Sequence, residues 1–321
     1  MIASGRTTNI DWQHNRPMTP IDEWQASGNF FNYRGHRIFW RAAGNCDARA
    51  LLLIHGFPTA SWDWEAVWPA LAQHYRLLAV DMIGFGFSDK PRRYEYRIAD
   101  QANIQESFLR LQGITEYHIL AHDYGDTVAQ ELLARQSEPG DRPKLRSVCF
   151  LNGGLFPETH RPTIVQRLLQ SYVGPIVTRL MTRDRFARSF IQVFGSKTQP
   201  TPAQIDAFWK LIVHNEGIRI YTSLIRYISE RRANRQRWVG ALQREDMPLK
   251  LIDGVADPVS GVQMVERYQQ LVPRPDIVIL EGVGHYPQVE APERVVEEYT
   301  AFRAQLSLAV QQNACSARVP A

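Results

Sequence analysis

The sequence contains little cysteine: Cys46, Cys149 and Cys315 are the three cysteines in 321 residues. Their wide spacing gives neither a disulfide framework nor the closely spaced Cys and His ligands of a metal site. We therefore expect a reducing, cytoplasmic compartment, and we expect no metal and no other cofactor.

Long apolar runs are also absent. No stretch approaches the roughly 20 apolar residues that a membrane-spanning helix requires, and the first 20 residues contain no apolar segment like that of a secretory signal. Apolar residues nevertheless make up 44% of the chain, which is enough for a sizeable core and argues against a disordered protein.

Acidic residues are scarce in one part of the chain. Residues 155–240 contain 14 lysines and arginines but only 5 acidic residues, whereas the whole chain has a net charge of +4. Such a basic segment can attract acidic substrates, a membrane surface or nucleic acid, and its plainer interpretation is a solvated, arginine-rich helical surface. Nucleic-acid recognition motifs are absent, so we expect no nucleic-acid partner and keep peripheral membrane contact as an alternative.

Apolar runs bounded by turn residues alternate with helical patterns along most of the chain. We expect a hairpin over 30–40 and buried strands over 50–56, 77–86, 117–123, 146–154, 249–254 and 276–282. Helical patterns cover 61–74, 97–112, 124–136 and 292–307. This alternation predicts the α/β class, with an eight-stranded, mostly parallel sheet that has helices on both faces.

The basic segment interrupts this alternation, so we interpret it as an inserted helical cap. The predicted organisation is an N-terminal extension over 1–25, the first part of the core over 26–154, the cap over 155–240, the second part of the core over 241–308 and a tail over 309–321. Nothing in the sequence decides between a monomer and a homodimer.

An acidic residue occupies a sharp turn between a predicted strand and a predicted helix. Residues 121–125 read AHDYG, and Asp123 holds the position that serine holds in the G-x-S-x-G motif of serine hydrolases. That motif occurs nowhere in the chain, which disfavours a serine esterase. Asp123 is therefore a candidate nucleophile, and the alternative is an ordinary helix N-cap.

Three other loops follow predicted strands. HGFP (55–58) is expected to bring the backbone N–H of Phe57 next to that of Tyr124, so that the two form an oxyanion hole. Asp257 lies in GVADP and His285 in GVGHYP. An ordinary Gly-Pro loop, turn chemistry at Asp-Pro and a structural histidine are the plainer interpretations. The chain order Asp123, Asp257, His285 is nevertheless that of a nucleophile, acid and histidine triad.

These motifs resemble the α/β-hydrolase superfamily over nearly the whole chain. The stretches that carry the resemblance are HGFPTASWDW, DMIGFGFSDKP, HDYGD, GVADP and GHYPQVE. The aspartate in the turn places the chain near the epoxide hydrolase and haloalkane dehalogenase branch. WQASGNFFNYRGHRIFW, HDYGDTVAQELLAR, LNGGLFPETHRP and RQRWVGAL resemble the mesoderm-specific transcript protein-like hydrolases, over about residues 24–305.

A triad with an aspartate nucleophile implies an alkyl ester. Asp123 would attack a saturated carbon, His285 would activate the water that hydrolyses the ester, and Asp257 would orient His285. Dehalogenases of this superfamily usually have Trp after the nucleophile and often Asn in the H-G-x-P loop. This chain has Tyr124 and Phe57 at those positions, which leaves a residue such as Trp62 to compensate.

Epoxide hydrolases of the superfamily protonate the leaving oxygen with tyrosines of the cap. The candidates here are Tyr227, Tyr172 and Tyr221, and the alternative for each is core packing. We therefore predict hydrolysis of a small apolar epoxide. The alternatives are a haloalkane or haloacid dehalogenase with the same triad, or a membrane-associated binding protein on a hydrolase scaffold.

Overall fold

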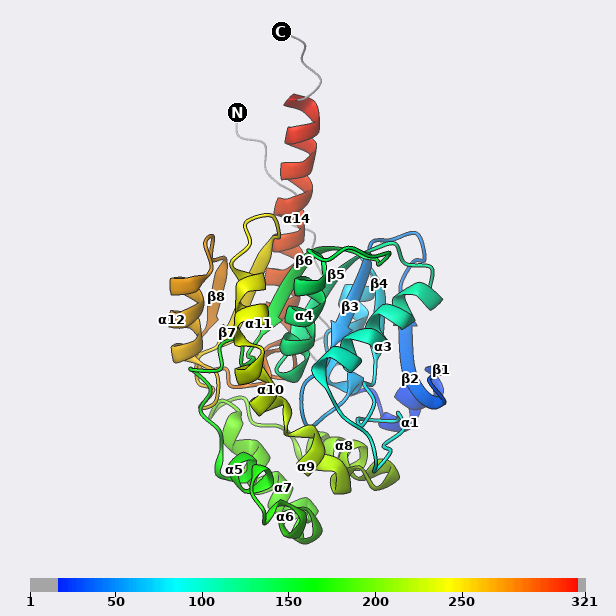
Figure 1. Ribbon diagram of the computed structural model, residues 1–321, viewed down its shortest axis with the longest axis vertical. Helices are drawn as coiled ribbons and strands as arrows, with labels where there is room; N and C mark the ends of the chain where they lie inside the picture. The colour runs from blue at the N-terminus through cyan, green and yellow to red at the C-terminus, as the bar shows by residue number, and fades with distance from the viewer. Residues whose placement is uncertain (1–16, 317–321) are drawn as a thin grey trace.

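The computed structural model describes residues 17–316, with side chains through Leu308. Its centre is one eight-stranded sheet in the order β1-β2-β4-β3-β5-β6-β7-β8 (Figure 1). The strands are β1 Asn29–Tyr33, β2 His36–Ala43, β3 Ala50–Ile54, β4 Arg76–Val80, β5 Glu116–His122, β6 Lys144–Leu151, β7 Leu249–Gly254 and β8 Ile277–Leu280. The predicted fold class is confirmed.

Only the first hairpin departs from parallel pairing. β2 pairs antiparallel with both β1 and β4, and the six strands β3 to β8 run parallel. Every residue of β3 is buried, as expected for a strand with helices on both faces. The parallel strands all end at one edge of the sheet, where the loops that follow β3, β5, β7 and β8 meet.

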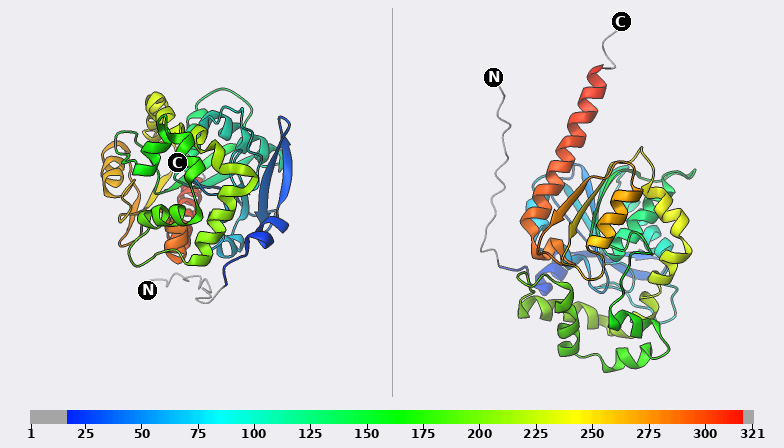
Figure 2. Two further views of the ribbon diagram at one scale, coloured as in Figure 1. Left: turned by 90° about the horizontal axis from the view of Figure 1, so that it is seen from below. Right: turned by 90° about the vertical axis from the view of Figure 1, so that its left-hand side faces the viewer.

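Helices cover both faces of the sheet (Figure 2). They include α2 Trp68–Ala72, α3 Ile98–Leu111, α4 Tyr124–Arg135, α11 Arg235–Leu242, α12 Val262–Leu271, α13 Pro287–Glu290 and α14 Pro292–Ser316. The helix predicted over 61–74 is divided into the 3-10 helix η1 Ser61–Trp64 and α2, because Pro69 favours a new helix start.

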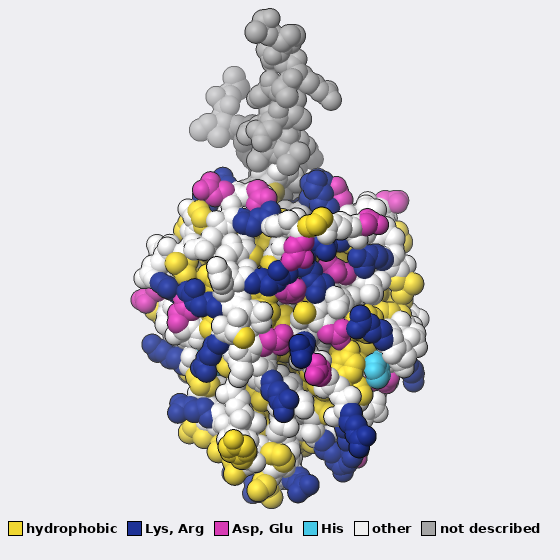
Figure 3. All heavy atoms as spheres, viewed as in Figure 1, with side chains coloured by type: hydrophobic (Ala, Val, Ile, Leu, Met, Phe, Trp, Pro, Cys, Tyr) yellow, Lys and Arg dark blue, Asp and Glu magenta, His cyan; other side chains and the backbone are white. Residues whose placement is uncertain are grey.

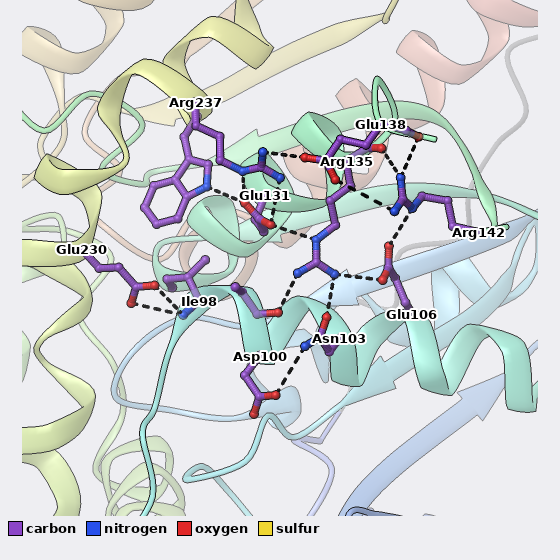
Figure 4. A network of polar contacts seen from close by, with 12 residues as sticks. Ile98, Asp100, Asn103, Glu106, Glu131, Arg135, Glu138, Arg142, Glu230 and Arg237 are labelled. Atoms are coloured by element: carbon purple, nitrogen blue, oxygen red, sulfur yellow. Dashed lines mark hydrogen bonds and ion pairs between the residues drawn. The ribbon is translucent and has the colours of Figure 1, made fainter. Parts of the chain in front are cut away.

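A network of charges, partly buried and partly exposed, links α4 to α3 and α11 (Figure 4). The Glu131 carboxylate accepts hydrogen bonds from Arg135 Nε at 2.8 Å, Arg237 Nε at 2.7 Å and Trp238 Nε1 at 2.8 Å. Burial alone would raise the pKa of Glu131, but these donors lower it, so the carboxylate stays charged. The helix that begins at the candidate nucleophile is thereby fixed at its far end.

The segment between β6 and β7 is helical. Its further helices are α5 Ile164–Gln170, α6 Gly174–Leu180, α7 Arg183–Phe190, α8 Pro202–Val213, α9 Tyr221–Leu224 and α10 Tyr227–Ala233. α5 to α9 lie together beyond one end of the sheet (Figure 1). α11 instead packs against α4, so the end of the segment predicted as cap (155–240) lies against the core.

Helices reach into both of the predicted terminal segments. α1 (Ile21–Ala26) begins in the predicted extension (1–25), of which residues 1–16 are outside the described part, and ends one residue beyond it. The helix buries Trp24 against Trp68 at 5.0 Å between ring centroids. α14 continues to Ser316 into the predicted tail, whose residues 317–321 are also outside. No helix within 17–316 combines the length and apolar character that crossing a bilayer requires.

Candidate active site

Asp123 lies at a strained turn between β5 and α4. Its φ of 48° and ψ of −106° are unfavourable for a residue with a side chain. Gly125 permits the turn, because a Cβ there would lie 2.3 Å from the carbonyl oxygen of Ile54. The Asp123 carboxylate makes no capping bond to α4, which removes the main support for the N-cap interpretation.

The carboxylate of Asp123 faces the loop after β3. Its Oδ2 accepts a hydrogen bond from the backbone N–H of Phe57 at 3.0 Å, as expected for one half of an oxyanion hole. Tyr124, the other predicted donor, is the first residue of α4, where a backbone N–H has no partner within the helix. Asp123 itself is buried, with 4% of its surface exposed.

His285 lies between two carboxylates. Its Nδ1 is 2.7 Å from Asp257 Oδ2, and its Nε2 is 3.8 Å from Asp123 Oδ1. Burial alone would lower the pKa of His285, but Asp257 and Asp123 together raise it to about 9. The structure therefore brings the three predicted residues together in one buried row.

Asp257 is fixed by several donors. Its oxygens accept hydrogen bonds from the backbone N–H of Val259 at 2.7 Å, the Ser260 hydroxyl at 2.7 Å and Asn152 Nδ2 at 3.2 Å. Burial alone would raise the pKa of Asp257, but His285 and the hydrogen bonds from Ser260 and Val259 lower it. A charged acid at this position can orient an imidazole and stabilise its protonated form.

A second imidazole, that of His122, borders the row. Its Nε2 is 2.7 Å from the carbonyl oxygen of His285, so the contact requires an N–H on that nitrogen. Burial, followed by the charge of His285, lowers the pKa of His122 to about 3. His122 is therefore neutral near pH 7 and supports the loop that carries His285.

A cavity of about 100 Å³ opens beside His285. Its lining is mostly apolar and comes from both the core and the helices of the inserted segment. The core contributes Phe57, Val259, His285 and Tyr286, and the inserted segment contributes, among others, Val165, Leu169, Phe190, Trp209 and Tyr221. The cavity thus suits a small apolar molecule.

The four predicted substrate-binding residues lie in different places. Tyr221 lines the cavity, and its hydroxyl donates to the carbonyl oxygen of Pro58 at 2.9 Å. Tyr227 is fully buried, with its ring 4.8 Å from that of Tyr124. Its hydroxyl has no hydrogen-bond partner among the described residues. The negative charge of Asp123 contributes, after burial, to raising the pKa of Tyr227, which indicates that the two side chains are close.

Tyr172 and Trp62, the other two predicted substrate-binding residues, lie away from the cavity. Tyr172 is fully exposed in the turn between α5 and α6, because this turn lies on the outer surface of the inserted segment. Trp62 is buried, but it packs against Phe208, and its Nε1 donates to the carbonyl oxygen of Thr19 at 2.9 Å. It is not among the residues that line the cavity.

Arg231 of α10 is a site residue that the sequence did not single out. It is 2% exposed, and its Nη2 donates to the backbone carbonyl of Asp123 at 3.2 Å and lies 3.8 Å from Asp123 Oδ1. Its Nε donates to the Thr127 hydroxyl at 2.7 Å. A full positive charge is thus buried behind the nucleophile. Arg231 belongs to a run of four arginines over 231–237, and no sequence signal distinguishes the buried one.

Asn152 was also missed. It follows β6 with a φ of 30°, and it exchanges two hydrogen bonds with the backbone of Gly254 at 2.6 and 2.9 Å. These bonds hold the loop of Asp257 against β6. The signal available in the sequence was the Asn-Gly-Gly that ends the strand, since Asn tolerates positive φ better than most residues.

Comparisons with known proteins agree with this architecture. The family model described as "Alpha/beta hydrolase family" matches residues 51–298. The chain is 42% identical over 293 residues to the mesoderm-specific transcript protein of Mus musculus, covering 88% of this chain and 87% of that protein. It is 36% identical over 277 residues to the LipZ hydrolase of Mycobacterium tuberculosis, covering 86% and 96%.

Two solved structures show the same fold at low identity. A loop variant of a haloalkane dehalogenase from Bradyrhizobium elkanii superposes with a TM-score of 0.74 at 22% identity, covering 89% of this chain and 99% of that chain. The epoxide hydrolase CorEH superposes with a TM-score of 0.71 at 19% identity, covering 87% and 99%. At these identities the likeness concerns the fold alone.

Proposed function

The chain belongs to the alpha/beta hydrolase family, and from that premise we propose that it hydrolyses small apolar epoxides through an ester on Asp123. One observation carries the proposal: the carboxylate of Asp123 occupies the turn of the nucleophile, with Nε2 of His285 3.8 Å away and Nδ1 of the same ring bound to Asp257. A carboxylate nucleophile suits attack on saturated carbon, because the ester that forms can be cleaved by water.

In the first step, Asp123 Oδ1 attacks an epoxide carbon, and the bond from that carbon to the ring oxygen breaks. The alkoxide takes a proton from the hydroxyl of Tyr227. This hydroxyl is buried near Asp123, has no other partner among the described residues and lies outside the cavity lining, so it can donate only to an epoxide that reaches past the cavity toward Asp123. Tyr221 is less suitable, because its hydroxyl already binds Pro58.

The ester changes the electrostatics of the site. Because the negative charge of Asp123 is one cause of the high pKa of His285, esterification lowers that pKa. The proton that His285 then releases restores the phenol of Tyr227. Neutral His285 next takes a proton from water, and the resulting hydroxide attacks the carbonyl carbon of the ester.

The oxyanion of this second step is stabilised by the backbone N–H groups of Phe57 and Tyr124. Loss of one such donor raises the activation free energy by about 2.7–4 kcal/mol in a protease. The backbone N–H of Phe57 already lies 3.0 Å from the Asp123 carboxylate before the substrate binds. Collapse of the tetrahedral intermediate releases the diol and regenerates the carboxylate of Asp123 and the protonated His285.

A dehalogenase with the same triad is the second candidate. Trp62 donates its indole N–H to Thr19, but Trp209 lines the cavity and carries an indole N–H, a group of the kind that binds a halide. A binding protein without chemistry would not require a hydrogen-bonded pair of Asp257 and His285, and that pair favours an enzyme.

Single-turnover reaction in ¹⁸O-labelled water tests the covalent route. With enzyme in excess over each member of a panel of terminal epoxides and short haloalkanes, we expect the epoxides to give diols whose newly added oxygen comes from Asp123, together with label in the Asp123 carboxylate. Asp123→Asn is expected to give no turnover. Halide release without diol would select the dehalogenase, and turnover that leaves Asp123 unlabelled for every substrate would overturn the ester.

A further inference from the structure

The outer face of α5 and α6 exposes large apolar side chains. Six of the twelve large hydrophobic side chains that are exposed within residues 17–308 lie on these two helices or in the turn between them. They are Ile164 (73% exposed), Leu168 (40%), Tyr172 (104%), Val173 (44%), Ile176 (54%) and Leu180 (56%). Ile164 and Leu168 are four residues apart on α5, as are Ile176 and Leu180 on α6, so each helix presents one apolar stripe. We call these six residues the cap patch.

Positive charge surrounds the cap patch. Residues 159–183 contain Arg161, Arg167, Arg179 and Arg183, and no aspartate or glutamate. In the part of the chain that the structure describes, the first three of these arginines have no ion pair, and all three side chains are exposed. Figure 3 shows hydrophobic side chains at the end of the molecule formed by α5 and α6, with Lys and Arg side chains next to them.

We propose that the cap patch docks the protein on the surface of an anionic lipid bilayer. Aliphatic side chains and a tyrosine can enter the boundary between headgroups and acyl chains, and the surrounding arginines can pair with lipid phosphates. The absence of acidic residues over 159–183 favours an anionic surface by charge complementarity. Tyr172 lies in the turn between the two helices, so it reaches the membrane first.

The position of the cap patch gives the docking a direction. The opposite face of α5 lines the cavity through Val165, Gln166 and Leu169, so one short helix separates the bilayer from the cavity. Docking through the cap patch places α14, which extends from the other end of the molecule, far from the membrane (Figure 2). The docking goes beyond the proposed chemistry and does not depend on it.

Vesicle sedimentation with the full chain tests the proposal. We expect the protein to sediment with vesicles of 70% phosphatidylcholine and 30% phosphatidylglycerol at 50 mM NaCl, and to be released by 500 mM NaCl, which shortens the range of the attraction. Vesicles of phosphatidylcholine alone are expected to bind at least about tenfold less protein, because they lack the anionic charge.

Paired variants separate the cap patch from the rest of the surface. Ile176→Ser with Leu180→Ser is expected to weaken partitioning at least about tenfold, whereas Leu111→Ser with Val262→Ser, which removes two equally exposed side chains from the core surface, leaves it unchanged. Each charge removed by Arg167→Gln or Arg179→Gln is expected to weaken partitioning about fivefold.

Three outcomes would overturn the proposal. The first is no sedimentation with anionic vesicles at 50 mM NaCl, and the second is an equal loss in the cap-patch variant and in the core-surface variant. The third is a change of oligomeric state in the cap-patch variant without vesicle binding by the native protein, which would make the cap patch a protein interface. Circular dichroism spectra that match the native protein establish that each variant is folded.

Discussion

Replacement of His285 by glutamine should destabilise the protein in a pH-dependent way. The imidazole lies 2.7 Å from Asp257 and 3.8 Å from Asp123, and its pKa is about 9 in the folded protein against 6.5 for an ordinary histidine. Because the folded-state pKa is the higher one, the folded protein holds this proton more tightly than the unfolded chain. The resulting stabilisation is complete below pH 6.5 and is lost as the pH rises through about 9.

The size of the effect follows from the two pKa values. Each pH unit between them corresponds to about 1.4 kcal/mol, so the interval from 6.5 to about 9 corresponds to about 3 kcal/mol. His285→Gln should therefore lower the free energy of unfolding by about 3 kcal/mol more at pH 6 than at pH 9.5. Groups that titrate elsewhere contribute equally to both proteins and cancel in this difference.

Urea unfolding followed by tryptophan fluorescence measures the difference at the two pH values. His74→Gln is the matched control, because His74 is exposed on the surface and its replacement should cost the same small amount at both pH values. Asp257→Asn should also remove most of the pH dependence, since Asp257 is the main partner that raises the pKa of His285. An equal cost of His285→Gln at pH 6 and pH 9.5 would refute the reasoning.

Three further predictions concern the proposed chemistry and the supporting residues. His285→Gln should lower kcat by about a thousandfold or more. The variant enzyme should also retain one covalent adduct per chain, measured as an increase in intact mass equal to the mass of the epoxide. The absence of this adduct under turnover conditions would contradict the role of His285 in the second step. Arg231→Met should cost about 3 kcal/mol of stability in urea unfolding, because it removes the buried partner of a buried carboxylate, whereas Arg232→Met, on the same helix but exposed, should cost less than about 0.5 kcal/mol. Tyr227→Phe should reduce kcat for epoxides at least about tenfold. It should change the free energy of unfolding by less than about 1 kcal/mol, because the hydroxyl has no hydrogen-bond partner within the described residues. The exposed Tyr172 is the control, since Tyr172→Phe should change neither quantity, and an unchanged kcat for Tyr227→Phe would assign the proton to another donor.

The sequence was most informative about the buried strands and the loops that follow them. Buried parallel strands read as short apolar runs, so β3, β5 and β7 were recognised with small errors at their ends. The positions of Asp123, Asp257 and His285 followed from the strands before them, because parallel strands end at one edge. The eight strands of the sheet were predicted from the apolar runs together with the first hairpin.

The sequence was least informative about the direction of side chains on the inserted helices. Tyr172, Tyr221 and Tyr227 look alike in a helical segment, yet one is fully exposed, one lines the cavity and one is buried behind Phe57. A rotation of a helix by one residue exchanges exposed and buried positions, and only tertiary packing fixes that rotation. Arg231 escaped notice for the same reason, since three other arginines of its run are more exposed.

The order of the reactive groups along the chain also sets an order in time. The carboxylate at position 123 leaves the ribosome 162 residues before the imidazole at position 285, and the whole inserted segment is synthesised between them. β7 and β8 must join the edge of an existing sheet before the imidazole can reach the carboxylate. A nascent or prematurely terminated polypeptide that ends before β8 therefore carries the nucleophile without the group that recycles it, and any electrophile it captured would remain attached.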